Sequence, residues 1–188
     1  MIWFVSDTHY GHKNIVKGVS GWTDTSGCRP FETLDEHNQW LVNMINARVA
    51  RQDTLYHLGD WSFGGKDKIK EFREQLNCER IHLVKGNHDH HITAHNSLSL
   101  FESVSHYLEL DNLVLMHYPI ESWHGMETGV RHLHGHVHGH VPSGTMAGRY
   151  DVGVDALGLV SMDDVRTWPK PTTQRHTTIE GGSRFGTN

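Results

Sequence analysis

The sequence predicts an α/β layered domain whose β-sheets are mixed rather than purely parallel. In the first half of the chain, short apolar segments alternate with longer segments of helical periodicity. From about residue 104 onward, segments typical of strands follow one another through short turns. The chain has 188 residues, of which 36% are hydrophobic and 21% are charged, a balance that suits one compact domain.

The elements of the first half follow from their length and spacing. Residues 1–5 are a continuous apolar run that is too short for a helix and is typical of a strand buried on both faces. The segment 33–36 has the form of a capping box, and the apolar residues after it recur at helical spacing, which predicts a helix over 33–50. The remaining elements expected here are a strand over 54–58, an amphipathic helix over 66–77 and a strand over 80–84.

The second half is predicted to be rich in strands. The expected elements are a strand over 104–110, a turn at Asp111-Asn112, a strand over 113–117 and two shorter strands near 131–134 and 149–154. Residues 166–188 are rich in Thr, Pro and Gly and are net basic. We therefore expect a single domain over residues 1–165, followed by a loosely packed tail over 166–188.

Composition narrows the classes of function. The net charge of -5 is unsuited to holding a polyanion by bulk charge, so a polyanionic substrate requires local positive charge. The two cysteines, Cys28 and Cys78, do not form a CxxC pair, which excludes a cysteine-based zinc module. The chain has 18 histidines, and without cysteine ligands a metal site would have to use His, Asp and Asn side chains. No apolar run is long enough to span a bilayer and no leader is recognisable, so we expect a cytoplasmic protein with no membrane partner.

Metal-ligating and acid-base side chains follow each of the main predicted strands. Because ligands bind outside the carboxyl ends of strands in α/β sheets, these side chains are expected to converge on one site. In extended chain, residues i and i+2 face the same side, so one short segment can present two ligands to that site. The clusters are Asp7-Thr8-His9, Gly59-Asp60, Gly86-Asn87-His88-Asp89, His117 and Gly135-His136-Val137-His138.

This ordered set resembles the calcineurin-like metallophosphoesterase superfamily, over roughly residues 1–160. The segments SDTHYGHKNI, YHLGDWSF, KGNHD, MHYPIESW and LHGHVHG are similar to those of its small bacterial and phage members without a cap domain. The resemblance implies a four-layer αββα sandwich of two mixed β-sheets flanked by helices.

The resemblance also implies a dinuclear metal centre. Asp60 would bridge the two ions, and His88 would act as a catalytic residue that binds no metal. The first ion would be held by Asp7, His9, Asp60 and His138, and the second by Asp60, Asn87, His117 and His136. A shell of His, Asp and Asn without thiolates suits two borderline divalent ions, with Mn expected and Fe, Zn or Ni as alternatives.

Such a centre is expected to hydrolyse a phosphoester. Two ions clamp the attacking and leaving oxygens, and a metal lowers the pKa of bound water from about 15.7 to about 7, so that a bridging hydroxide needs no protein base. His88 would then serve the leaving group. We favour a phosphodiesterase acting on a nucleotide or nucleic acid, because a chain of this length leaves little room for a cap over the site.

Two alternatives remain open at the level of sequence: a phosphomonoesterase acting on a small metabolite, and a metal-binding scaffold without catalysis. A protein phosphatase is disfavoured because the Arg that follows the GD motif in those enzymes is absent from the segment 59–65. No obligate protein partner is inferred.

Several further residues have competing interpretations. His12 and Arg149 are candidate substrate contacts, with ordinary surface charge as the alternative for Arg149. Asp155 either supports a ligand histidine or caps a loop, whereas Asp89 is expected to brace its own loop or to orient His88. Five aromatic residues near the motifs form either a stacking wall for a nucleobase or part of the core; they are Tyr10, Trp61, Phe63, Tyr118 and Trp123.

Overall fold

The computed structural model describes residues 1–92, 99–140 and 147–171, which form two β-sheets with helices. The first sheet has the strand order β4 (Ser103–Ser105), β3 (Arg80–Val84), β2 (Thr54–His57), β1 (Ile2–Val5) and β9 (Val160–Ser161). Its strands β1 to β4 are parallel, and β9 runs antiparallel to β1. The expectation of a mixed sheet is therefore confirmed for this half of the fold.

The second sheet is also mixed. Its strand order is β5 (Leu108–Leu110), β6 (Leu113–Leu115), β7 (Arg131–His134) and β8 (Arg149–Asp151). Strands β5 and β6 form an antiparallel hairpin, whereas β6, β7 and β8 are parallel to one another.

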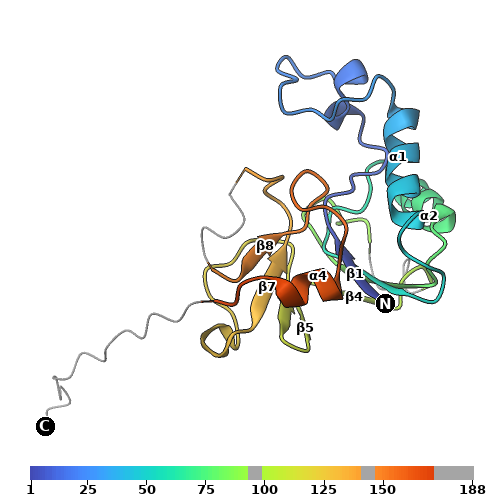
Figure 1. Ribbon diagram of the computed structural model, residues 1–188. Helices are drawn as coiled ribbons and strands as arrows, with labels where there is room; N and C mark the ends of the chain where they lie inside the picture. The colour runs from blue at the N-terminus through green and yellow to red at the C-terminus, as the bar shows by residue number, and fades with distance from the viewer. Residues whose placement is uncertain (93–98, 141–146, 172–188) are drawn as a thin grey trace, which may run out of the picture.

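The two faces of the first sheet belong to different cores. Helices α1 (Leu34–Asn46) and α2 (Lys66–Gln75) cover one face, where their apolar side chains pack on those of the strands. The opposite face, including Phe4 and Tyr56, packs on Leu115 and Leu133 of the second sheet. Figure 1 shows the two helices on one side of β1 and the strands β7 and β8 on the other.

The layers are therefore helix, sheet and sheet. The third α-helix of the described residues, α4 (Met162–Thr167), contributes Met162 and Val165 to the core between the sheets. No α-helix within the described ranges covers the outer face of the second sheet, so the expected four-layer sandwich is not confirmed. The short 3-10 helices are η1 (Lys13–Ile15), η2 (Lys17–Val19) and η3 (Met126–Thr128).

Local sequence signals explain where the helices begin. The Thr33 hydroxyl accepts a hydrogen bond from the Glu36 amide, and the Glu36 carboxylate accepts one from the Thr33 amide. This is the expected capping box, although the helix ends at Asn46 rather than near residue 50. A second capping box, which the sequence analysis missed, joins Ser161 and Asp164 at the start of α4.

The single strand expected over 104–110 is wrong. The chain leaves the first sheet after β4, and β5 begins in the second sheet three residues later. Strand β4 pairs with β3, whereas β5 pairs with β6. Both strands are only partly buried, and their similar mixture of apolar and polar residues does not mark the point where the chain changes sheet.

The end of the described chain is packed. The predicted boundary at residue 165 falls inside α4, and the Arg131 guanidinium donates hydrogen bonds to the carbonyls of Trp168 and Pro169. Residues 172–188 of the predicted tail lie outside the described residues. None of the helices in the described ranges combines the length and the apolar character needed to cross a bilayer.

The buried imidazole of His132 on β7 makes fold stability depend on pH. Its Nδ1 lies 3.2 Å from the Val114 carbonyl oxygen, and burial lowers the pKa of His132 to about 4. The unfolded chain takes up this proton near pH 6.5, before the folded protein does, so stability falls as the solution is acidified.

We predict that the free energy of unfolding falls by about 2 to 3 kcal/mol more in the wild type than in His132→Gln between pH 7.5 and 4.5. Urea unfolding of both proteins in EDTA measures this difference. Identical pH profiles for the two would contradict a neutral, buried His132.

Candidate metal centre

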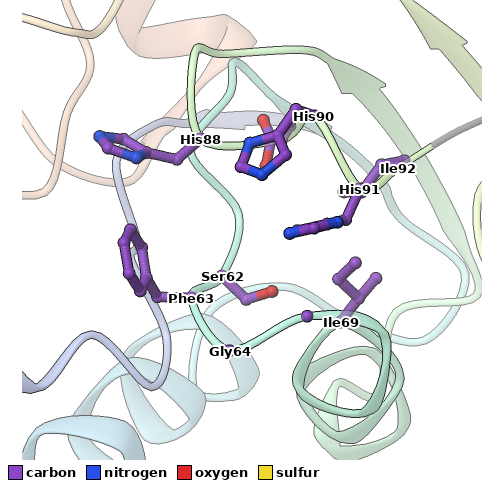
Figure 2. Close-up of a pocket in the computed structure, with 10 residues that line it drawn as sticks. Ser62, Phe63, Gly64, Ile69, His88, His90, His91 and Ile92 are labelled. Carbon is purple, nitrogen blue, oxygen red and sulfur yellow. The ribbon is translucent and has the colours of Figure 1, made fainter.

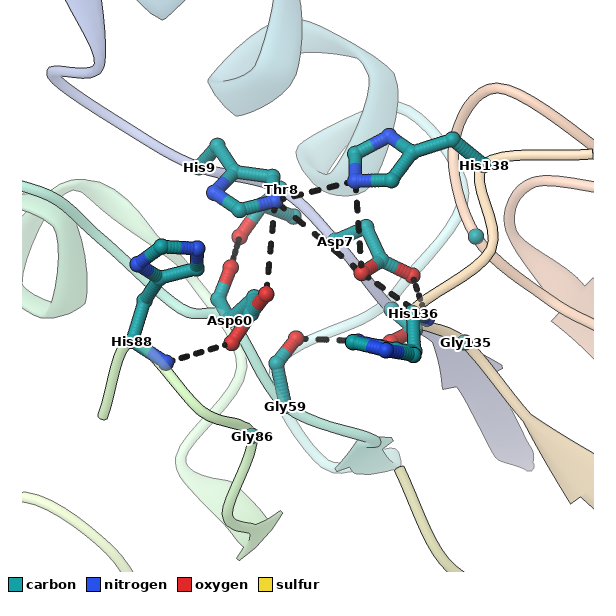
Figure 3. Close-up of polar contacts among 12 residues, drawn as sticks. Asp7, Thr8, His9, Gly59, Asp60, Gly86, His88, Gly135, His136 and His138 are labelled. Carbon is teal, nitrogen blue, oxygen red and sulfur yellow. Dashed lines mark hydrogen bonds and ion pairs between the residues drawn. The ribbon is translucent and has the colours of Figure 1, made fainter. Parts of the chain in front are cut away.

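The seven predicted ligands come together at the carboxyl ends of strands from both sheets. Asp7 and His9 follow β1, Asp60 follows β2, and the remaining ligands, Asn87, His117, His136 and His138, follow β3, β6 and β7. Figure 3 shows Asp7, His9, Asp60 and His138 pointing toward one another, with His88 beside Asp60. The structure thus brings together side chains that lie up to 131 positions apart in the sequence.

The backbone at these positions adopts a conformation that side chains disfavour. Left-handed φ angles in non-glycine residues are uncommon and cost on the order of 1–3 kcal/mol each. Within the described residues six non-glycine positions have positive φ, and the one outside the site is Asp111 in a turn. The other five are predicted ligands: Asp7 (56°), His9 (48°), Asp60 (57°), His136 (74°) and His138 (49°).

One group of ligand atoms surrounds Asp7. The Nε2 atoms of His9 and His138 lie 3.3 Å apart, and they lie 4.0 and 3.9 Å from Asp7 Oδ1. All three side chains offer atoms close enough together to hold one metal ion. These residues are the ones that the resemblance assigned to the first ion, together with Asp60.

A second group surrounds Asn87. Its Oδ1 lies 3.2 Å from His117 Nε2 and 3.0 Å from His136 Nδ1. Asp60, His117 and the carboxylate of Asp7 also lie within range of a common ion. Asp7 is therefore close to both groups, which the sequence did not indicate.

Asp60 lies between the two groups. Its Oδ2 is 3.5 Å from His9 Nε2 and 3.5 Å from His117 Nε2. Its other oxygen, Oδ1, accepts a hydrogen bond from the His88 amide at 2.9 Å. Asp60 Oδ2 is thus equally distant from a ring nitrogen of the group around Asp7 and from one of the group around Asn87.

The charge state of the site suits a divalent cation. Burial raises the pKa of Asp7 to about 7 and raises that of Asp60 above its ordinary value. Burial also lowers the pKa of His9 far below its usual range and that of His117 to about 4. These rings are therefore neutral, the form that ligates metals, and the carboxylates have only histidines as ion-pair partners in the described residues.

The backbone lies directly against the two carboxylates at two glycines, where no larger residue would fit. A Cβ atom on Gly135 would collide with the carboxylate of Asp7, and a Cβ atom on Gly86 would collide with that of Asp60. Nitrogen and oxygen donors without thiolates are suited to borderline divalent ions. The residues present therefore fit a metal ion.

A buried arginine that the sequence analysis missed supports the loop after β1. The Arg29 guanidinium donates hydrogen bonds to the carbonyls of Asp7 and Thr8 at 2.6 and 2.8 Å. It also binds both oxygens of the Asp155 carboxylate, at 2.9 and 2.6 Å. Nothing in the local sequence around Arg29 signals this role, because Asp7, Thr8 and Asp155 are all more than 20 residues away.

Asp155 supports a ligand histidine, one of its two expected roles. It lies 2.7 Å from His138 Nδ1 and so fixes which ring nitrogen faces Asp7. Burial alone would lower the pKa of His138, but the hydrogen bond to Asp155 and the charge of Asp7 raise it. Asp89 braces its loop as expected, since its carboxylate accepts hydrogen bonds from the amides of Asp60, Trp61 and Gly86.

His88 and His12 lie beside the ligands. The His88 ring centroid is 5.4 Å from that of His9 and 6.4 Å from that of His12. His12 also caps η1, where its Nδ1 accepts a hydrogen bond from the Ile15 amide, and burial lowers the pKa of His12 to about 4. Both histidines are therefore within reach of a substrate bound at the ligands.

Arg149 is not brought to the cluster. It is the first residue of β8, whereas the ligands follow the carboxyl ends of the strands, and its guanidinium approaches the Ile120 carbonyl at 3.5 Å. No contact among the described residues joins Arg149 to a predicted ligand. The other candidate substrate contact, His12, is the one that the fold places near the site.

The five aromatic residues near the motifs divide into two kinds. Tyr10, Trp61 and Trp123 are buried, and the first two belong to the core beneath α1 and α2. Phe63 and Tyr118 remain exposed, at 40% and 38%. Phe63 lies beside His88, whereas Tyr118 lies beside His117 and His136.

Comparison with known proteins finds a solved structure of similar fold but does not assign a family. No family model matches the chain. A crystal structure of a protein of unknown function from Aquifex aeolicus superposes with a TM-score of 0.64 and 22% identity, covering 88% of this chain and 97% of that one. Nuclease MPE of Pseudomonas putida gives a TM-score of 0.45 and 20% identity over 73% of this chain and 60% of its own, a likeness too low to indicate a shared function.

Two curated proteins are similar in sequence. An uncharacterized protein of Methanocaldococcus jannaschii is 37% identical over 90 residues, which span 47% of this chain and 46% of that protein, so the match covers about half of the relative's length. The Gene 66 protein of Mycobacterium phage D29 is 28% identical over 88% of this chain and 94% of its own. The expected resemblance to phage proteins thus has a counterpart in a phage sequence.

We predict that Asp155→Asn weakens divalent metal binding by about 10- to 100-fold, because the negative charge that orients His138 is lost. Competition with a chelating dye measures this affinity. The matched control is Asp163→Asn, which alters an exposed carboxylate on α4 that pairs with Arg166. Equal affinities of the two variants would contradict the role given to Asp155.

Proposed function

We propose that this protein is a metal-dependent phosphoesterase of the calcineurin-like type, with a dinuclear centre that hydrolyses phosphodiesters of nucleotides or nucleic acids. The observation that carries the proposal is the position of Asp60. A single buried carboxylate oxygen lies 3.5 Å from a ring nitrogen in each of two ligand groups. A bridging ligand between two ions has this arrangement.

The ligand assignment follows from the two groups. Asp60 would serve both ions, and Asp7, which lies near both groups, would serve the first. The full sets are Asp7, His9, Asp60 and His138 for the first ion, and Asp60, Asn87, His117 and His136 for the second. Two bound divalent ions supply a nucleophile at neutral pH and neutralise charge on the phosphoryl oxygens.

His88 is proposed as the residue that protonates the leaving oxygen. Its amide is fixed to Asp60 Oδ1, while its half-buried ring extends beside the ligands and belongs to neither metal-binding group. A hydroxide, formed when a water molecule releases a proton to solvent, would add to phosphorus; the bond from phosphorus to the leaving oxygen would break, and that oxygen would take a proton from the His88 ring. A positioned general acid contributes roughly 10² to 10⁴-fold to the rate.

A diester is favoured over a monoester by the charge around the site. Arg29 contacts the loop carrying Asp7, and its guanidinium is buried and committed to Asp155 and to backbone carbonyls. This arginine is therefore not free to bind the second charge of a monoester dianion, whereas a diester carries a single negative charge. The exposed side chains of Asn87 and His136 leave an open face for a substrate with groups on both sides of phosphorus.

We predict that Asp60→Asn loses both metal ions together with activity, because it weakens the ligand shared by the two groups. Elemental analysis of the purified variant and of the wild type, both reconstituted with Mn, measures the loss. Retention of two ions and the wild-type rate would contradict the bridging assignment.

His88→Asn should retain both ions while kcat falls by at least about 100-fold. The substitution keeps a polar side chain and the backbone amide that binds Asp60. Metal content and kcat are measured on the same preparation, and a loss of metal would instead make His88 a ligand.

The choice of substrate class is tested by comparing bis(p-nitrophenyl) phosphate with p-nitrophenyl phosphate in the presence of Mn. We expect the larger kcat/KM on the diester. A larger value on the monoester would establish a phosphomonoesterase, and two tightly bound ions without hydrolysis of either ester would establish a metal-binding scaffold.

A further inference from the structure

A cavity of about 400 Å³ opens beside His88, outside the ligand cluster. This volume lies within the range of small-molecule sites, about 300–1,000 Å³. Figure 2 shows Phe63 and His91 on opposite sides of it, with Ile69 and Ser62 between them. The cavity touches the proposed site at His88, which lines one of its walls.

The walls of the cavity are largely apolar and partly aromatic. Ile69 and Ile92 are buried at its base, and the Phe63 ring is 40% exposed. The Phe63 ring centroid lies 5.3 Å from that of His88 and 4.1 Å from that of His12. An exposed ring packed against two histidines offers a planar surface for stacking without rearrangement of the fold.

Ser62 provides an unpartnered polar group at this cavity. The residue is 7% exposed, and its Oγ is buried without a hydrogen-bond partner among the described residues. Figure 2 shows the hydroxyl pointing between Ile69 and His91. Leaving a buried hydroxyl unpaired costs about 1–3 kcal/mol, so a ligand that supplies a partner gains affinity there.

The combination selects one class of ligand. A purely apolar group would fill the cavity but leave Ser62 unpaired, and a sugar would pair with Ser62 but has no flat π face to stack on Phe63. A nucleobase has a flat face for stacking and an edge with hydrogen-bond donors and acceptors, which a serine hydroxyl can pair with.

The opposite flank of the site offers a different environment. A cavity of about 430 Å³ there is lined by Trp22, Cys28 and Arg29 together with the ligands His136 and His138. Its lining also includes the apolar residues Ile15, Pro30 and Val137, so apolar, charged and metal-ligating side chains are mixed there. Tyr118, the exposed aromatic residue beside His136, does not line either of these cavities.

We propose that the cavity lined by Ser62, Phe63 and His91 binds the nucleobase of the leaving nucleoside, which places the ester oxygen of that nucleoside beside His88. The proposal rests on the phosphoesterase function, because His88 identifies the leaving side only if it protonates the leaving oxygen. The base would stack on Phe63, and its edge would pair with the Ser62 hydroxyl.

The test compares the binding of two phosphates that differ by one group. Adenosine 5′-monophosphate and ribose 5-phosphate share the phosphate and the sugar, and the second lacks the base. Calorimetric titration of the Mn-loaded protein should show roughly 5- to 150-fold tighter binding of the nucleotide, the range expected for stacking of one base. Phe63→Ala should reduce this ratio to near one.

Tyr118→Ala is the matched control, because Tyr118 is exposed to the same degree as Phe63 and lies on the other flank. It should preserve the ratio. Ser62→Ala should weaken nucleotide binding by about 3- to 10-fold without lowering Tm, since the hydroxyl has no partner to lose in the free protein. A fall in Tm with unchanged binding would make the hydroxyl structural and overturn its role.

The outcomes separate this proposal from the proposed function. Hydrolysis of diesters together with equal binding of the two phosphates would overturn the base site and leave the function intact. Selective nucleotide binding that depends on Phe63, in a protein that hydrolyses neither ester, would support the base site and overturn the function. Loss of selectivity in Tyr118→Ala instead of Phe63→Ala would place the base on the opposite flank and contradict the proposal.

Discussion

The burial of two carboxylates, Asp7 and Asp60, without a fixed positive charge beside them is the constraint on which the rest of the structure depends. A buried carboxylate is costly unless it is protonated, paired or bound to a metal. Here the neighbouring imidazoles include those of His9 and His117, whose own burial lowers their pKa values and keeps them neutral. A divalent cation would therefore neutralise the negative charge of this site. The apolar layers on both sides of β1 exclude the water that would otherwise solvate the two carboxylates.

This arrangement requires strain that must be offset elsewhere. Five predicted ligands occupy the left-handed region, and glycines at 86 and 135 allow the backbone to approach the carboxylates. Arg29 and Asp155 connect the loop after β1 to the histidine segment after β7, so the two sheets share one hydrogen-bonded network at their carboxyl ends. Strain of this kind persists when the surroundings over-determine the conformation, as they do at functional sites.

The sequence predicted the features that depend on local pattern. The strands over 2–5, 54–57 and 80–84, the capping box at Thr33 and the convergence of polar residues after strands follow from periodicity and from the geometry of α/β sheets. It did not predict features that depend on long-range contacts. The change of sheet near residue 106, the pairing of β9 with β1 and the role of Arg29 are set by partners distant in sequence. Trp61 and Phe63, two residues apart, look alike in the sequence, yet one is core and the other lines a cavity.

The central claim is that one carboxylate oxygen lies between two metal ions, and crystals of the protein grown with Mn test it most directly. Anomalous diffraction should reveal two peaks about 3.5 to 4 Å apart. One peak should lie among Asp7, His9 and His138, the other among Asn87, His117 and His136, with Asp60 between them. A single peak, or peaks away from these residues, would contradict the account.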